Sequence, residues 1–135
     1  MASAIRVLLV DDNPEFLKSA SEFLALQPSL QVVGYAISGA EALEQIPRLA
    51  PHLILMDWAM PHMSGLEATQ RIKAQKNAPR VVILTLYNIR QYRTAAQLAG
   101  ADGFISKADW GAQLMPLIQQ LFAAPVTPPN GNRQV

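Results

Sequence analysis

Five polar side chains share one feature, because each lies at or directly after the end of a short apolar run. They are Asp11, Asp12, Asp57, Thr85 and Lys107. Three carboxylates with ordinary pKa values near ~4 repel one another unless a cation joins them. Mg²⁺ meets this need, because it takes oxygen ligands and suits a site with few protein ligands plus waters. A lysine ammonium and a threonine hydroxyl beside that metal could hold the oxygens of a phosphoryl group, for which a carboxylate serves as nucleophile.

Five apolar runs predict the strands that would bring these side chains together. The runs cover residues 5–10, 30–36, 52–57, 80–85 and 103–107. Continuous apolar runs of this length are typical of parallel strands that are buried on both faces. The carboxyl ends of parallel strands meet at one edge of the sheet, where open α/β folds place their chemistry. The sequence therefore predicts a single crevice that contains the three carboxylates, the hydroxyl and the ammonium.

Helices are predicted between the strands and after the last one. Asn13 and Pro14 are suited to the cap and the first residue of the first helix, whose apolar stripe includes Phe16. Residues 38–41 and 64–67 have the Ser-x-x-Glu spacing of a capping box, so each predicts the start of a helix. Strands that alternate with helices imply an open α/β sheet covered on both faces.

The last two helices are less regular in sequence. Residues 88–91 could cap the fourth helix and Gly100 would stop it, and Leu98 is its expected apolar anchor. The fifth helix is expected from about residue 109 to 122, with a kink or a shortened first turn at Pro116.

Composition limits the class of protein. The chain has 135 residues, of which 50% are hydrophobic and 16% charged, as expected for one domain with a substantial core. A net charge of +1 gives the chain no strong overall electrostatic attraction to nucleic acid or to a membrane. The absence of cysteine excludes disulfides and thiolate chemistry. Without a signal peptide or an apolar run of about 20 residues, a cytoplasmic location is expected. We expect one domain over residues 1–123, followed by a disordered proline-rich tail or a truncated linker at 124–135.

These features together resemble the receiver domain of two-component response regulators. The resemblance covers about residues 5–122 and rests on motifs that occur in the family's order. They are the acidic pair 11–12, Asp57 at the end of the third strand, the turn Met60-Pro61-His62-Met63-Ser64-Gly65, Thr85, and the segment 100–107. The resemblance implies a flavodoxin-like (βα)5 three-layer sandwich with a parallel sheet in the order 2-1-3-4-5.

The family resemblance also implies a role for each acidic residue of the site. Asp57 would be the phosphoacceptor and would receive its phosphoryl group from a histidine kinase or a phosphotransfer protein. Asp12 would be a direct ligand of Mg²⁺ or Mn²⁺, and Asp11 would act mostly through bound water. Asp57 itself and the main-chain carbonyl of Ala59 would complete the metal's protein ligands. No other enzymatic activity and no membrane partner are expected.

The remaining implied roles concern the response to phosphorylation. Thr85 would hydrogen-bond a phosphoryl oxygen, Lys107 would pair with the phosphoryl group, and Phe104 matches an aromatic switch position that turns inward. The signal would then appear on the surface of the fourth helix, the fifth strand and the last helix. That surface could serve a homodimer, or a DNA-binding effector domain if the chain is truncated. Ala59 and Tyr87 replace residues that are often polar in the family, so we expect an altered phosphoryl lifetime.

Two other classes of protein share part of this pattern. A Mg²⁺-dependent phosphohydrolase of the haloacid dehalogenase type also uses an aspartyl nucleophile, but it has Asp-x-Asp after the first strand. Residues 11–13 are Asp-Asp-Asn, and at a length of 135 residues we expect no cap domain. A flavin-binding module of the same fold would need a Ser/Thr/Gly-rich phosphate loop where two acidic residues lie here. Stoichiometric labelling by acetyl phosphate, turnover of a phosphate ester and yellow colour would distinguish the three.

Overall fold

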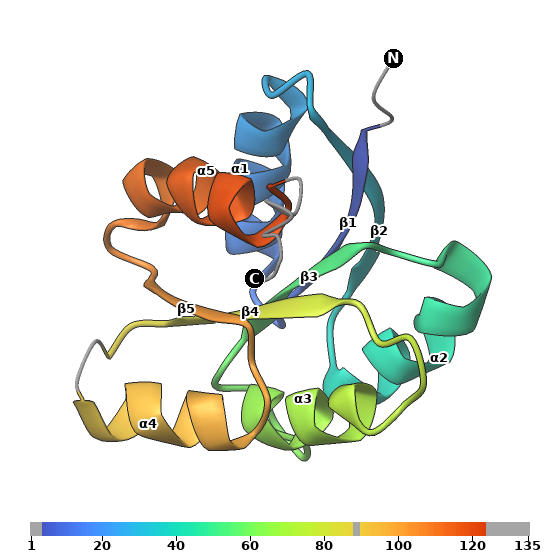
Figure 1. Ribbon diagram of the computed structural model, residues 1–135, viewed down its shortest axis with the longest axis vertical. Coiled ribbons are helices and arrows are strands. Elements are labelled where there is room, and N and C mark those ends of the chain that lie inside the picture. The colour runs from blue at the N-terminus through green and yellow to red at the C-terminus, as the bar shows by residue number, and fades with distance from the viewer. Residues whose placement is uncertain (1–3, 88–89, 124–135) are drawn as a thin grey trace, which may run out of the picture.

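The computed structural model describes residues 4–87 and 90–123, and its strands form one parallel sheet (Figure 1). The strands are β1 (Ile5–Val10), β2 (Leu30–Ala36), β3 (Leu53–Asp57), β4 (Arg80–Thr85) and β5 (Gly103–Ser106). They lie side by side in the order β2-β1-β3-β4-β5. This is the order of the flavodoxin-like fold, so the predicted fold class is confirmed.

Helices cover both faces of the sheet (Figure 1). They are α1 (Pro14–Ala25), α2 (Gly39–Leu49), α3 (Gly65–Lys73), α4 (Arg90–Leu98) and α5 (Trp110–Leu121). Helices α1 and α5 pack on one face, and α2, α3 and α4 pack on the other, which gives the predicted three layers.

The central strand β3 is buried along its whole length. Its side chains alternate between the two faces of the sheet. Leu53 and Leu55 join the core cluster beneath α1 and α5, whereas Ile54 and Met56 join the cluster beneath α2, α3 and α4. Full burial of each such side chain stabilises the fold by about 1.5–3 kcal/mol. Asp57 therefore lies at the end of a strand that is buried along its whole length.

The register of the sheet brings the strand ends level with one another. Val10 pairs with Met56 across β1 and β3, and Asp57 pairs with Leu84 across β3 and β4. Thr85 pairs with Ser106, the last residue of β5. The polar residues at or just beyond these ends consequently gather at one edge of the sheet.

The predicted starts of α1, α2 and α3 are confirmed by their hydrogen bonds. The side-chain oxygen of Asn13 accepts from the backbone N–H of Glu15 at 3.0 Å and of Phe16 at 3.4 Å. Ser38 Oγ and Ser64 Oγ each accept from the backbone N–H three residues later at 3.1 Å. These side chains satisfy amide groups that have no partner inside the helix.

The fourth helix differs from the prediction in its apolar anchor. Leu98 is 84% exposed, so the expectation that it packs against the core is wrong, whereas Ala96 is 1% exposed. The two residues lie about 200° apart around the helix, because each helical residue advances by about 100°. Gly100 has a φ of 97° and follows the helix as predicted. The cap predicted at residue 88 and the tail at 124–135 lie outside the described residues.

Several predicted boundaries shift by a few residues. Strand β3 begins at residue 53 rather than 52, β5 ends at 106 rather than 107, and α5 spans 110–121 rather than 109–122. Pro47 lies inside α2, and α5 continues on both sides of Pro116. These changes leave the site residues at the same edge of the sheet.

Candidate functional site

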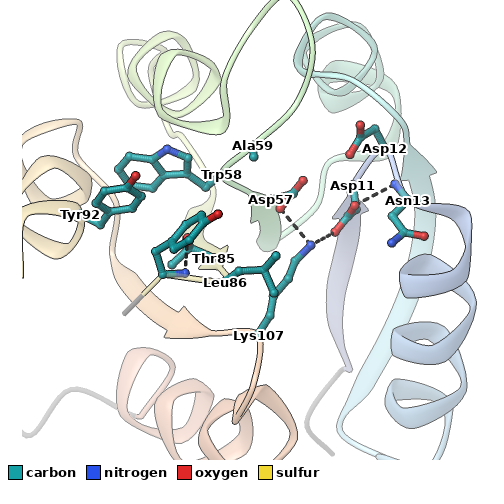
Figure 2. A pocket seen from close by; sticks show the side chains of 11 residues that line it. Asp11, Asp12, Asn13, Asp57, Trp58, Ala59, Thr85, Leu86, Tyr92 and Lys107 are labelled. Carbon is teal, nitrogen blue, oxygen red and sulfur yellow. Dashed lines mark hydrogen bonds and ion pairs between the residues drawn. The ribbon is translucent and has the colours of Figure 1, made fainter. Parts of the chain in front are cut away.

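Three carboxylates form an acidic group at the carboxyl edge of the sheet (Figure 2). Asp11, Asp12 and Asp57 each offer an oxygen, and these atoms all lie within 4.8 Å of one another. Asp11 and Asp57 are buried, whereas Asp12 is exposed. Buried carboxylates this close together are favourable only when cations offset their repulsion. An all-oxygen set of this charge fits a hard divalent cation.

Lys107 supplies the positive charge that faces this group. Its Nζ lies 2.7 Å from Asp11 Oδ2 and 3.0 Å from Asp57 Oδ1, as the dashed lines of Figure 2 show. Burial alone would lower the pKa of Lys107, but the hydrogen bonds to Asp11 and Asp57 outweigh this effect and raise the pKa above its usual value. The ammonium is therefore charged at neutral pH and bridges two strand ends.

Asp57 has an unusual acidity for an aspartate. Burial, helped by the neighbouring charges of Asp11 and Asp12, raises the pKa of Asp57 from 3.8 to about 6, against the opposing effect of Lys107. The ionised carboxylate is therefore less stable in the folded protein than in water. A second cation beside Asp57 would relieve this unfavourable state.

Asp11 is held in place from two sides. Its Oδ1 accepts from the backbone N–H of Asn13 at 2.9 Å, while its other oxygen binds Lys107. Since Asn13 also caps α1, the start of this helix and the orientation of the Asp11 carboxylate are coupled.

Thr85 lies at the end of β4 beside Lys107. The backbone N–H of Lys107 donates to the Thr85 carbonyl at 2.7 Å, and the Thr85 hydroxyl accepts from the backbone N–H of Tyr87 at 3.1 Å. The hydroxyl proton can still be donated to another oxygen. Thr85 is 2% exposed, so this donor lies inside the site rather than on its rim.

The turn after β3 is fixed by close backbone contacts. The N–H of Trp58 donates to the Leu84 carbonyl at 2.9 Å, and the N–H of Gly65 donates to the Trp58 carbonyl at 2.8 Å. A Cβ at Gly65 would collide with the backbone carbonyl of Asp57, so only glycine allows α3 to begin this close to the acidic residue.

A pocket of about 370 Å³ opens above these residues. It is lined by Asp11, Asp12, Asn13, Asp57, Trp58, Ala59, Thr85, Leu86, Tyr87, Tyr92 and Lys107. Every predicted site residue except Phe104 is in this lining, so the structure brings together the side chains that the sequence assigned to one crevice. It also places Ala59 there, although the role of its carbonyl stays a prediction.

Aromatic rings form the opposite wall of the pocket (Figure 2). Trp58 stacks on Tyr92 of α4 with ring centroids 4.8 Å apart, and Tyr87 meets Tyr92 edge-on at 5.6 Å. Phe104 lies behind this wall, with its ring 6.4 Å from Trp58 and the Arg93 guanidinium 4.9 Å from its centroid. Phe104 is 9% exposed and thus adopts a packed position.

Sequence reasoning missed two partners of the site residues. It did not pair Tyr92 with Trp58, and it assigned Phe16 only to the apolar stripe of its helix. In the structure the ring of Phe16 lies under Lys107, with Nζ 4.4 Å from the ring centroid. No signal in the linear sequence distinguishes these rings from ordinary core residues, because helical spacing accounts for both.

Comparison with known proteins identifies the family. The family model described as the response regulator receiver domain matches residues 7–119. The chain belongs to this family. The receiver domain resemblance predicted from the motifs is thereby confirmed.

Individual relatives support the same assignment. The response regulator GacA of Pseudomonas viridiflava is 37% identical over 119 residues, which are 88% of this chain and 56% of that protein. Protein-glutamate methylesterase/protein-glutamine glutaminase 4 of Myxococcus xanthus is 42% identical over 105 residues, which are 76% of this chain and 30% of that protein. This receiver domain thus spans about half the length, or less, of the curated relatives it matches.

A solved structure shows the same arrangement of elements. The signal receiver domain of the response regulator NarL from Mycobacterium tuberculosis superposes with a TM-score of 0.82 at 28% identity, covering 89% of this chain and 97% of that chain. Among the described residues, no helix of this receiver domain is long and apolar enough to cross a membrane.

Proposed function

We propose that this receiver domain accepts a phosphoryl group on Asp57 from a phosphohistidine of a kinase or phosphotransfer protein. The observation that carries the proposal is the position of Asp57 in the pocket, 3.0 Å from the Lys107 ammonium and within 4.8 Å of two further carboxylates. Ion pairing with Lys107 favours the carboxylate form, which is the nucleophile.

The transfer is a displacement at phosphorus. A carboxylate oxygen of Asp57 forms a bond to phosphorus as the bond from phosphorus to the histidine nitrogen breaks, and the imidazole leaves as it takes up a proton. A bound Mg²⁺ or Mn²⁺, held by Asp11, Asp12, Asp57 and the Ala59 carbonyl, would neutralise charge on the phosphoryl oxygens. Lys107 and Thr85 would contribute an ammonium and a hydroxyl as further donors to those oxygens.

The same donors provide a switch. Moving a population from 1:99 to 99:1 requires a difference of about 5.5 kcal/mol between two states. Hydrogen bonds to charged groups contribute about 1.5–3 kcal/mol each, so one new contact each from Thr85 and Lys107 reaches this difference only at the upper end of that range. We propose that Phe104 follows Thr85 and changes the surface of α4, β5 and α5. Its support is the packed position of Phe104 between Trp58 and Arg93.

The output of the domain is also a proposal. Since the matched region is about half of a relative such as GacA, we propose that a receiver domain over residues 1–123 controls a second element, such as a DNA-binding effector domain. A homodimer through the receiver is a further mode of output. We propose a cytoplasmic location, and that the chain acts on its own aspartate rather than turning over a separate substrate.

Acetyl phosphate labelling tests the phosphoacceptor. With Mg²⁺ present, intact-mass spectrometry should show the gain of one phosphoryl group per chain, and Asp57→Asn should remove it. Asp109→Asn is the matched control, because Asp109 is an exposed aspartate whose side chain makes no cap hydrogen bond. Labelling that persists in Asp57→Asn would refute the assignment. Catalytic release of phosphate from an ester would favour the phosphohydrolase instead.

A further inference from the structure

Phe16 lies on a third side of the Lys107 ammonium. The Nζ atom is 2.7 Å from Asp11 Oδ2, 3.0 Å from Asp57 Oδ1 and 4.4 Å from the centroid of the Phe16 ring. The Lys107 side chain is 13% exposed, so most of its surroundings are protein rather than water. An ammonium over an aromatic face is attracted by the ring quadrupole, and more strongly where water is excluded.

The ring itself is held by a second aromatic contact. Phe16 meets Trp110, the first residue of α5, with centroids 5.6 Å apart and planes inclined at 58°. Trp110 in turn packs edge-on against Phe23, at 4.9 Å. Trp110 follows Lys107 by three residues, so the Phe16 ring contacts both ends of the short turn between β5 and α5. The ring that contacts the Lys107 ammonium is thus also tied to the start of α5.

We propose that Phe16 is a positioning residue of the phosphoryl site, which holds the Lys107 ammonium beside Asp57 through its ring face. The inference rests on the proposed phosphoacceptor function of Asp57. Lysine has four rotatable side-chain bonds, and confining it costs conformational entropy. The ring lowers that cost by keeping the ammonium at the edge of the sheet.

The contribution of Phe16 grows when a cation joins the carboxylates. Asp11 and Asp57 are the residues that hold Lys107, and they also belong to the group that fits a divalent cation. A metal and the ammonium therefore compete for the same oxygens. The uncharged ring takes no part in this competition. It remains a partner of Lys107 at the moment when the ammonium must turn toward a phosphoryl group.

Binding of a phosphoryl analogue tests the positioning role. We would measure the affinity of the whole chain for beryllofluoride in saturating Mg²⁺ by isothermal titration calorimetry. A cation–π contact predicts that Phe16→Leu weakens binding by about threefold to thirtyfold. Phe16→Tyr keeps the ring face and should bind like the wild type. Mg²⁺ affinity, measured without beryllofluoride, should not fall in either variant.

A double-mutant cycle separates positioning from packing. Urea unfolding would be measured for wild type, Phe16→Leu, Lys107→Met and the double variant. Methionine keeps the apolar length of the lysine without its charge. If the ring holds the ammonium, the losses are non-additive, because Phe16→Leu costs less once the charge is absent. Additive losses would show that Phe16 only fills space, and would overturn the proposal.

The outcomes also separate this inference from the proposed function. If the wild type binds beryllofluoride and Phe16→Leu binds it equally well, the positioning role is refuted and the phosphoacceptor stands. If the wild type neither binds beryllofluoride nor takes label from acetyl phosphate, the phosphoacceptor itself is refuted. Should Phe16→Leu not fold, Phe16→Met, which fills the site with a flexible apolar chain, replaces it in both measurements.

Discussion

The burial of Asp57 predicts that its replacement by asparagine stabilises the metal-free protein at pH 8. The ionised carboxylate lies 5% exposed next to Asp11. Asparagine has nearly the same shape and carries no charge, so it removes this repulsion and the cost of burying an ion. The residue proposed as the reactive group would thus be one that lowers the stability of its own fold.

The pKa gives the size and the pH window of the effect. Burial raises the pKa of Asp57 from 3.8 to about 6, which corresponds to a cost of about 3 kcal/mol for the ionised form. Because the pocket is open to solvent, we discount this to about 2 kcal/mol. Between pH 3.8 and about 6 the folded state binds more protons at Asp57 than the unfolded state does, so stability falls as the pH rises through this window.

Urea denaturation in EDTA at pH 4 and pH 8 measures the difference directly. At pH 4 the carboxyl is mostly protonated in the folded protein, and the two proteins should have similar midpoints. At pH 8 the midpoint of Asp57→Asn should be higher by about 1 M, for a slope of about 2 kcal/mol per M. Asp109→Asn, which removes an exposed charge, should show no such gain. An Asp57→Asn protein no more stable than wild type at pH 8 would refute the reasoning.

Three further predictions concern the neighbours of Asp57. Lys107→Met should lower the free energy of unfolding at pH 8 by about 2 kcal/mol, because it leaves the buried carboxylates of Asp11 and Asp57 without their cation. Urea denaturation measures this loss, and unchanged stability would contradict the prediction. Ala59→Asn adds a side chain able to position water, so the phosphorylated protein should lose its label faster in a mass-spectrometric time course. Equal lifetimes would argue against a role for Ala59. Tyr92→Leu should cost about 0.5–1.5 kcal/mol and alter Trp58 fluorescence, whereas Tyr92→Phe should preserve both.

The strand ends were predictable because their signals are local. A continuous apolar run that stops at Asp57 indicates both that β3 is buried and that the strand ends at this residue. Parallel pairing then places Asp57 and Thr85 at the same edge of the sheet. Helix starts were predictable for the same reason, since Ser38 and Ser64 bond amides only three residues away.

Contacts between distant elements were not predictable. The ring that supports Lys107 comes from α1 and the ring that stacks on Trp58 comes from α4, and only the packing of the helices on the sheet brings these residues together. The error at Leu98 has a related cause. An alanine-rich helix can bury its small residues against the sheet, so the largest apolar side chain need not mark the inner face.

The ion pairs of Lys107 would favour a divalent over a monovalent cation at this edge of the sheet, whatever the size of the ion. The Lys107 ammonium is a counterion that belongs to the chain itself. The fold therefore gives it a high effective concentration beside Asp11 and Asp57. A monovalent ion from solution offers the same charge without being tethered, so it has little advantage in displacing the lysine. A divalent ion brings twice the charge to three carboxylates. Sodium and potassium, although abundant in cells, would therefore compete poorly at this edge of the sheet.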